Sequence, residues 1–124
     1  MLLVEDEPLV RQLANRVLSS AGYAVVEAEN GPGALALARR HEGIDLLLTD
    51  VVMPGIGGRE LRDRIVAEHP GLPVLFMSGY PALPGSGEPF GFAPGEAILA
   101  KPFTGEELLA KVAQALGRVT VPAA

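Results

Sequence analysis

The sequence contains no cysteine, and this absence excludes both disulfide bridges and thiolate metal sites. Any chemistry must therefore use oxygen ligands, histidine or lysine. Long apolar runs are also missing, since even the run at residues 44–48 is interrupted by Asp45. A membrane-spanning helix needs about 20 apolar residues, so no membrane contact is expected of this chain.

Positive charge is scarce as well, because 10 basic residues face 15 acidic ones and leave a net charge of −5. A nucleic-acid surface needs a basic patch, so no nucleic-acid partner is expected. The first residues show no export signal, and a cytoplasmic location is expected. The arginines are scattered among acids and are expected to lie on solvated helix faces, as Glu60 and Arg64 at i,i+4 spacing suggest; they include Arg11, Arg16, Arg39, Arg59 and Arg62.

What the sequence does contain is enough apolar material for one core, 48% of 124 residues. Short apolar runs alternate with helical patterns, which indicates βαβ units around a parallel sheet. The expected strands are residues 1–4, 23–28, 44–49, 73–77 and 97–100, and the expected helices begin at Pro8, Gly33, Arg59 and Thr104. We predict a domain over residues 1–118 and a tail or the start of a linker over 119–124.

The first helix carries an apolar stripe formed by Leu9, Leu13 and Val17 together with the neighbouring Val10, Ala14 and Leu18, and Gly22 is expected to end the helix. A different pattern follows the fourth strand: residues 81–95 contain four prolines and four glycines. Inside a helix each proline costs about 3 kcal/mol and each glycine about 1 kcal/mol. The fourth helix should therefore be short, irregular or disordered.

Together these elements predict an α/β fold of the flavodoxin-like, doubly wound (βα)5 type, with a five-stranded parallel sheet in the order 2-1-3-4-5. Ligands of such sheets bind at the carboxyl ends of strands 1 and 3. Glu5 and Asp6 follow the first strand, and Asp50 follows the third. The topology therefore predicts that these carboxylates meet at one edge.

Three carboxylates at one edge repel one another, by about 4 kcal/mol per pair at about 4 Å and an effective dielectric near 20. A cation relieves this repulsion, and an all-oxygen site suits Mg²⁺, with Mn²⁺ as a substitute. Lys101 and Ser78 end the fifth and fourth strands and would add a positive charge and a hydroxyl donor. Such a site suits phosphoryl transfer to Asp50 as nucleophile.

Each residue also has an ordinary interpretation when taken alone. The acids at residues 5–7 can simply favour a helix dipole, Asp50 can form a turn, and Ser78 followed by glycine is common turn chemistry. The functional interpretation gains weight because these residues fall at the carboxyl ends of four different strands.

Four blocks, at residues 4–8, 49–55, 76–80 and 101–103, resemble in order the signature blocks of response-regulator receiver domains. The resemblance covers essentially the whole chain. The residues of the second and third blocks are similar to those of receivers in hybrid sensor histidine kinases. It implies that Asp50 accepts a phosphoryl group from a histidine kinase or a histidine phosphotransfer protein. It implies metal binding by Glu5, Asp6, Asp50 and the backbone carbonyl of Val52, and phosphoryl contacts from Ser78 and Lys101.

The resemblance also implies a cis bond between Lys101 and Pro102, and it marks Tyr80 as a candidate shield of the phosphoaspartate. Receivers assist their own phosphorylation and dephosphorylation rather than acting as turnover enzymes. Three features depart from the family pattern: Ile98 stands where an aromatic switch residue is usual, residues 81–95 replace the usual fourth helix, and Gly57-Gly58 replaces the usual acidic-Gly or Ser-Gly pair.

Three alternatives remain. The first two departures favour a receiver-like interaction module that signals without phosphorylation, although the complete set of site residues opposes it. An FMN-binding flavodoxin shares the topology, but the acids after the first strand would repel the flavin phosphate. An aspartyl phosphatase would carry its nucleophile after the first strand. A homodimer also remains open.

Overall fold

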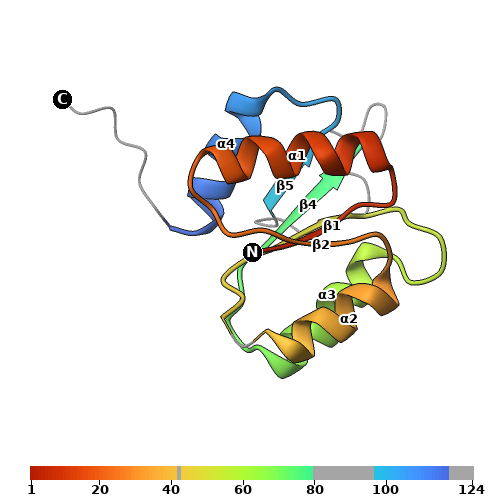
Figure 1. The fold of residues 1–124 in the computed structure, drawn as a ribbon. Helices are drawn as coiled ribbons and strands as arrows, with labels where there is room; N and C mark the ends of the chain where they lie inside the picture. The colour runs from red at the N-terminus through yellow and green to blue at the C-terminus, as the bar shows by residue number, and fades with distance from the viewer. Residues whose placement is uncertain (42, 80–96, 118–124) are drawn as a thin grey trace, which may run out of the picture.

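The computed structural model describes residues 1–41, 43–79 and 97–117, which form a five-stranded parallel sheet flanked by helices (Figure 1). The sheet order is β2-β1-β3-β4-β5, which confirms the predicted flavodoxin-like topology. The strands are β1 (Leu2–Val4), β2 (Val26–Ala28), β3 (Leu47–Asp50), β4 (Val74–Ser78) and β5 (Ala97–Ala100). The helices are α1 (Pro8–Ser20), α2 (Gly31–Arg40), α3 (Gly58–Glu68) and α4 (Gly105–Ala115).

Some predictions fall on residues outside these ranges. The irregular segment at residues 81–95 and the tail at 119–124 are among them, so the helix labelled α4 is the last helix that the sequence predicts. Among the described helices, none is both long and apolar enough to cross a bilayer.

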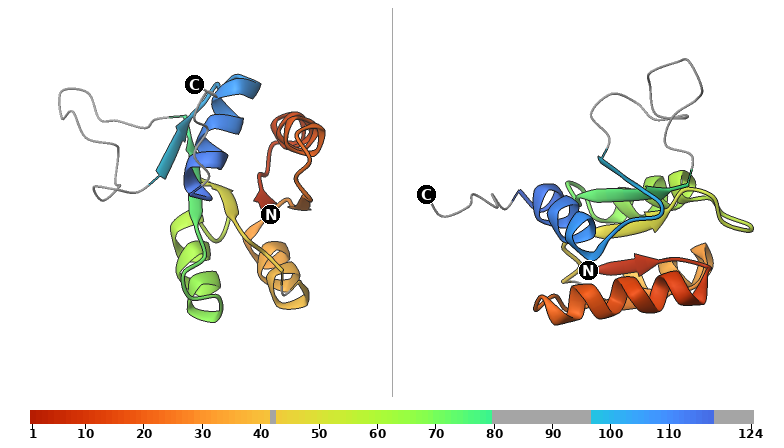
Figure 2. Two further views of the ribbon diagram at one scale, coloured as in Figure 1. Left: turned by 90° about the vertical axis from the view of Figure 1, so that its left-hand side faces the viewer. Right: turned by 90° about the horizontal axis from the view of Figure 1, so that it is seen from above.

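The helices form two layers, with α1 and α4 on one face of the sheet and α2 and α3 on the other (Figures 1 and 2). Successive residues of a strand point to opposite faces, so Leu3 and Leu48 pack under α1 and α4 while Leu2 and Leu47 pack over α2 and α3. A strand covered on both faces needs an unbroken apolar run. This requirement explains why β1 and β3 are largely apolar until they reach Glu5 and Asp50 at their carboxyl ends.

Thr104 and Gly22 mark helix ends as predicted. At Asn30 the sequence predicts a turn before a helix from Gly33, whereas α2 begins at Gly31. Thr104 and Glu107 form a reciprocal capping box at the start of α4, each side chain accepting from the other residue's backbone N–H at 3.1 Å. Asn30 caps α2 by accepting from the Gly33 N–H at 2.8 Å. Gly22 follows α1 with a φ of 96°, a conformation that glycine adopts readily.

The strands β2 and β3 are shorter at their beginnings than the apolar runs predict. The run at residues 23–28 pairs only from Val26, opposite Leu2, and the run at 44–49 pairs from Leu47. Because β1 spans only three residues, its neighbours find backbone partners only along that length. Tyr23 and Val25 pack against the core without joining the ladder.

The predicted apolar stripe of α1 is buried along only one of its sides. Leu9 is 74% exposed and Leu13 is 51% exposed, whereas Ala14 and Leu18 are fully buried. Residues four apart share one face of a helix, so Leu9 and Leu13 form a pair on the outer side of α1. The sheet and α4 cover only the side that carries Ala14, Val17 and Leu18.

One glycine marks a close approach that positions Asp50. Gly58, the first residue of α3, donates its N–H to the Val51 carbonyl at 2.8 Å and is buried. A Cβ atom at Gly58 would overlap the backbone carbonyl oxygen of Asp50. The end of β3 and the start of α3 therefore touch backbone to backbone.

We predict that Gly58→Ala lowers the free energy of unfolding by about 2–3 kcal/mol, because the methyl group must push α3 away from Asp50. Urea denaturation followed by circular dichroism measures the change. Gly43→Ala is the matched control, since a Cβ there meets nothing within 4 Å, and its effect should stay within about 0.5 kcal/mol. Equal stability of the two variants would contradict the close contact.

Candidate functional site

Three carboxylates meet where β1 and β3 end. The two strands are neighbours in the sheet, with Val4 opposite Thr49, so Glu5 and Asp6 emerge beside Asp50. One oxygen from each of the three carboxylates lies within 4.8 Å of the others. Glu5 and Asp50 are buried, and Asp6 is exposed. The predicted cluster is therefore present, with two of its acids buried at the sheet edge and the third open to solvent.

Lys101 bridges two of these acids from the end of β5. Its Nζ donates to Glu5 Oε2 at 2.8 Å and to Asp50 Oδ2 at 2.8 Å. The Lys101 N–H donates to the Ser78 carbonyl at 2.8 Å, which extends the β4–β5 ladder by one bond. The peptide bond between Lys101 and Pro102 is cis, as the resemblance implies. One ammonium thus connects acids from two strands.

Burial and charge shift two pKa values within this group. Burial raises the pKa of the Glu5 carboxyl above 4.5, with a further rise from the charge of Asp50, and the hydrogen bond from Lys101 opposes this only in part. Burial alone would lower the pKa of Lys101, but its hydrogen bonds to Asp50 and Glu5 outweigh that effect and raise the pKa above 10.5. Lys101 therefore keeps its positive charge at neutral pH.

Every polar atom of Glu5 has a partner. Its N–H donates to the Ala28 carbonyl at 3.1 Å, and its Oε1 accepts from the Glu7 N–H at 3.2 Å. Its Oε2 accepts from Lys101 at 2.8 Å, and its backbone carbonyl accepts from Arg11 Nη1 at 2.7 Å. Because Glu5 is only 1% exposed, these bonds hold it in one orientation.

Arg11 is the residue that the sequence pattern misjudges. The sequence pattern places it with the arginines of solvated helix faces, yet it is half-buried and contacts the backbone of the acidic turn. Arg11 lies one helical turn after Glu7, and its backbone N–H donates to the Glu7 carbonyl at 3.0 Å. That position brings the guanidinium back toward the strand that precedes the helix.

The other predicted site residues occupy various places around the cluster. Ser78 is buried at the end of β4, and Ile98 is half-buried in β5 opposite Phe76. The side chain of Val52 is 75% exposed. Tyr80 lies outside the described residues. Ser78 and Lys101 thus flank the cluster, while Ile98 lies further back along its strand.

The donor set suits a hard divalent cation. Glu5, Asp6 and Asp50 offer carboxylate oxygens, and no imidazole or thiolate takes part in this cluster. Mg²⁺ is bound in proteins by one or two carboxylates together with water and phosphate oxygens. The exposed Asp6 leaves one side of the cluster open to solvent. The three acids can therefore hold such an ion.

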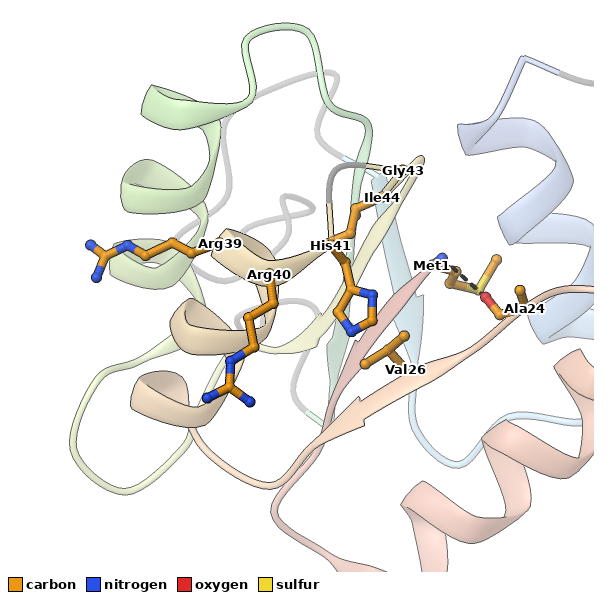
Figure 3. A pocket seen from close by; sticks show the side chains of 8 residues that line it. All are labelled: Met1, Ala24, Val26, Arg39, Arg40, His41, Gly43 and Ile44. Carbon is orange, nitrogen blue, oxygen red and sulfur yellow. Dashed lines mark hydrogen bonds between the residues drawn. The ribbon is translucent and has the colours of Figure 1, made fainter.

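A hollow lies at the opposite end of the sheet from the acidic cluster (Figure 3). It has a volume of about 440 Å³ and is lined by the beginnings of β1 and β2 and by the end of α2, including Met1, Val26 and His41. It shares no residue with the acidic cluster.

The chain is similar to known proteins along nearly its whole length. The model of the family "Response regulator receiver domain" matches residues 1–113. The response regulator receiver protein CpdR of Brucella abortus is 35% identical over 117 residues, which cover 94% of this chain and 95% of CpdR. The transcriptional regulatory protein YrkP of Bacillus subtilis is 35% identical over 121 residues, or 98% of this chain and 51% of YrkP.

The chain thus spans about half the length of YrkP. Among solved structures, the receiver domain from the hybrid histidine kinase CckA superposes with a TM-score of 0.77 at 39% identity, covering 93% of this chain and 96% of that one. The order of the strands, the acid cluster and these matches agree. The chain belongs to the response regulator receiver domain family of two-component signalling proteins.

Proposed function

We propose that this chain is a phosphoacceptor domain that takes a phosphoryl group onto Asp50 from a phosphohistidine donor with the help of Mg²⁺. The observation that carries the proposal is the bridge of Lys101 between Glu5 and Asp50, with Asp6 beside them. In this arrangement the nucleophilic carboxylate of Asp50 lies next to the fixed positive charge of Lys101. It also lies next to the carboxylate oxygens that would bind Mg²⁺.

The proposed reaction is a displacement at phosphorus. A carboxylate oxygen of Asp50 attacks the phosphorus, the P–O bond forms as the P–N bond to the donor imidazole breaks, and the imidazole leaves with the bonding electron pair. The product is an acyl phosphate on Asp50. Such transfers need little covalent help from a protein and depend on positioning and on charge stabilisation.

The residues around Asp50 divide this work. Lys101 already donates to Asp50 at 2.8 Å, so its ammonium is placed to pair with an oxygen of the incoming phosphoryl group. We assign Ser78 the hydroxyl contact to another oxygen. Glu5, Asp6, Asp50 and the Val52 carbonyl would hold Mg²⁺ or Mn²⁺, which neutralises phosphoryl charge when bound.

We infer that the donor is a histidine kinase or a histidine phosphotransfer protein, and that the transfer takes place in the cytoplasm. Leu9 and Leu13 support a protein partner, because they are exposed apolar side chains on the helix that follows the acid pair. The match covers 51% of YrkP, which supports a receiver joined to a further domain, whereas it covers 95% of CpdR. We propose that residues 1–118 are the receiver and that residues 119–124 are a tail or the start of a linker.

A second candidate is a receiver that signals by constitutive binding. Ile98 favours it, because an aliphatic side chain in β5 cannot act as the aromatic switch that the family pattern includes. The complete set of Asp6, Asp50, Ser78 and Lys101 favours the phosphoacceptor. Direct phosphorylation separates the two functions.

We predict that the protein, incubated with Mg²⁺ and acetyl phosphate, gains the mass of one phosphoryl group, and that Asp50→Asn abolishes this gain because an amide is not a nucleophile. Intact-protein mass spectrometry measures the outcome. Asp63→Asn is the control, since Asp63 is exposed on α3, and it should be labelled like the wild type. An unlabelled wild-type protein would refute the phosphoacceptor function.

We predict that Mg²⁺ binds more tightly as pH rises above 4.5, by about 3- to 10-fold in total. The raised pKa of Glu5 means that its proton persists above pH 4.5 and competes with the cation. Titration calorimetry at several pH values measures the dissociation constant. Glu5→Gln should bind Mg²⁺ more weakly but with a flatter pH dependence, and parallel profiles would contradict this role of Glu5.

We predict that Leu13→Asp slows phosphotransfer from a protein donor by about tenfold, because a charge would replace an apolar contact. Labelling by acetyl phosphate should stay at the wild-type rate, since a small donor does not touch α1. Ala67→Asp, an exposed position on α3, is the matched control. Equal slowing with both donors would show damage to the site rather than to a docking surface.

A further inference from the structure

We propose that Arg11 is a positioning residue that orients the acid pair for the divalent cation by holding the backbone carbonyl of Glu5. This inference rests on the proposed function, since the cation matters only if the acidic cluster binds one. The observation that carries it is the hydrogen bond from Arg11 Nη1 to Glu5 O, at 2.7 Å.

This hydrogen bond is short and charge-assisted. Backbone N–H···O bonds cluster near 2.9–3.0 Å, and donors that carry a charge bind more closely and more strongly. A guanidinium offers five N–H donors and no acceptor. Because Arg11 is half-buried, water competes for the bond less than it would at an exposed site.

The bond acts on Asp6 through the peptide unit. The Glu5 carbonyl and the Asp6 N–H belong to one planar group, so fixing the direction of the carbonyl fixes the plane that leads into Asp6. The other side of Glu5 is held by its N–H bond to Ala28 at 3.1 Å. Glu5 is thus held on both sides of its α-carbon, and the backbone entry to Asp6 is set.

Asp6 needs this support more than its neighbours do. Glu5 and Asp50 are buried and bound to Lys101, whereas Asp6 is exposed in the turn between β1 and α1. An exposed turn residue loses backbone freedom when it binds an ion, at a cost of about 1–2 kcal/mol per ordered residue. The Arg11 bond removes part of that freedom before the ion arrives.

The chemistry of arginine suits this task. Its guanidinium is planar and rigid, so it directs its N–H groups along fixed lines, whereas a lysine ammonium is a mobile point charge on a flexible stem. Arg11 lies at the end of the first turn of α1, and the backbone of this helix is fixed by its own hydrogen bonds. The helix therefore serves as the rigid base from which the turn is held.

The test compares Arg11→Met and Arg11→Lys with Arg16→Met, a control at an exposed position of the same helix. Methionine keeps an apolar stem but removes every donor. We expect Arg11→Met to weaken Mg²⁺ binding by about 3- to 10-fold, the effect of one hydrogen bond, with a partial effect for Arg11→Lys and none for Arg16→Met. Titration calorimetry measures the affinity, and thermal unfolding selects the variants that are folded.

Two further readouts separate positioning from general damage. In the metal-free protein, Arg11→Met should shift the NMR signal of the Asp6 amide, and Arg16→Met should leave it in place. With acetyl phosphate, the Mg²⁺ concentration for half-maximal labelling should rise, while the rate at saturating Mg²⁺ should stay within about 2-fold of the wild type. That division is expected when binding of the ion is affected and transfer is not.

The outcomes also separate this proposal from the proposed function. Unchanged Mg²⁺ affinity in both folded Arg11 variants, or an equal loss in Arg16→Met, would overturn the role of Arg11. Wild-type protein that binds Mg²⁺ but takes no label would overturn the phosphoacceptor function and leave the affinity and NMR comparisons valid. If Arg11→Met does not fold, Arg11→Lys decides, and wild-type affinity in that folded variant counts against the proposal.

Discussion

Repulsion between buried carboxylates is the constraint around which this structure is arranged. Glu5 and Asp50 lie at the ends of neighbouring strands with little access to water, and their charges can coexist there only with a cation between them. The Lys101 ammonium fills that place at 2.8 Å from each. A third acid, Asp6, stays at the surface, where a mobile ion can reach it. The fold thus supplies one positive charge permanently and leaves room for another.

The two-layered core explains why this cluster is so well placed. Leucines on both faces of β1 and β3 bury the central strands completely, so the backbone beneath the acids has few alternatives. The polar residues begin where the apolar runs stop. Rigid strands therefore set the positions of Glu5 and Asp50, while the turn that carries Asp6 is held by the bond from the Glu7 N–H to the Glu5 side chain and by the bond from the Arg11 side chain to the Glu5 carbonyl.

Sequence patterns predicted the topology and the meeting of the acids because both follow from strand order, which short apolar runs and helix signals reveal. The same patterns failed where tertiary packing decides. Leu9 and Leu13 fit a helical stripe but face outward, since the sheet and α4 cover a narrower side of α1. Arg11 looked like any surface arginine, because nothing in local periodicity shows that a guanidinium reaches a strand end. The contact of Gly58 with Asp50 depends equally on distant geometry.

The backbone contact at Gly58 has a mechanical consequence. With no side chain between them, the peptide of Asp50 and the first turn of α3 behave as one stiff joint. The backbone of Asp50 therefore has no space to move toward α3 unless the start of α3 moves with it, and Leu61 and Ile65 anchor that helix in the core shared with α2. A displacement of the Asp50 backbone would then be coupled to the position of α3, on the face of the sheet away from α1 and α4.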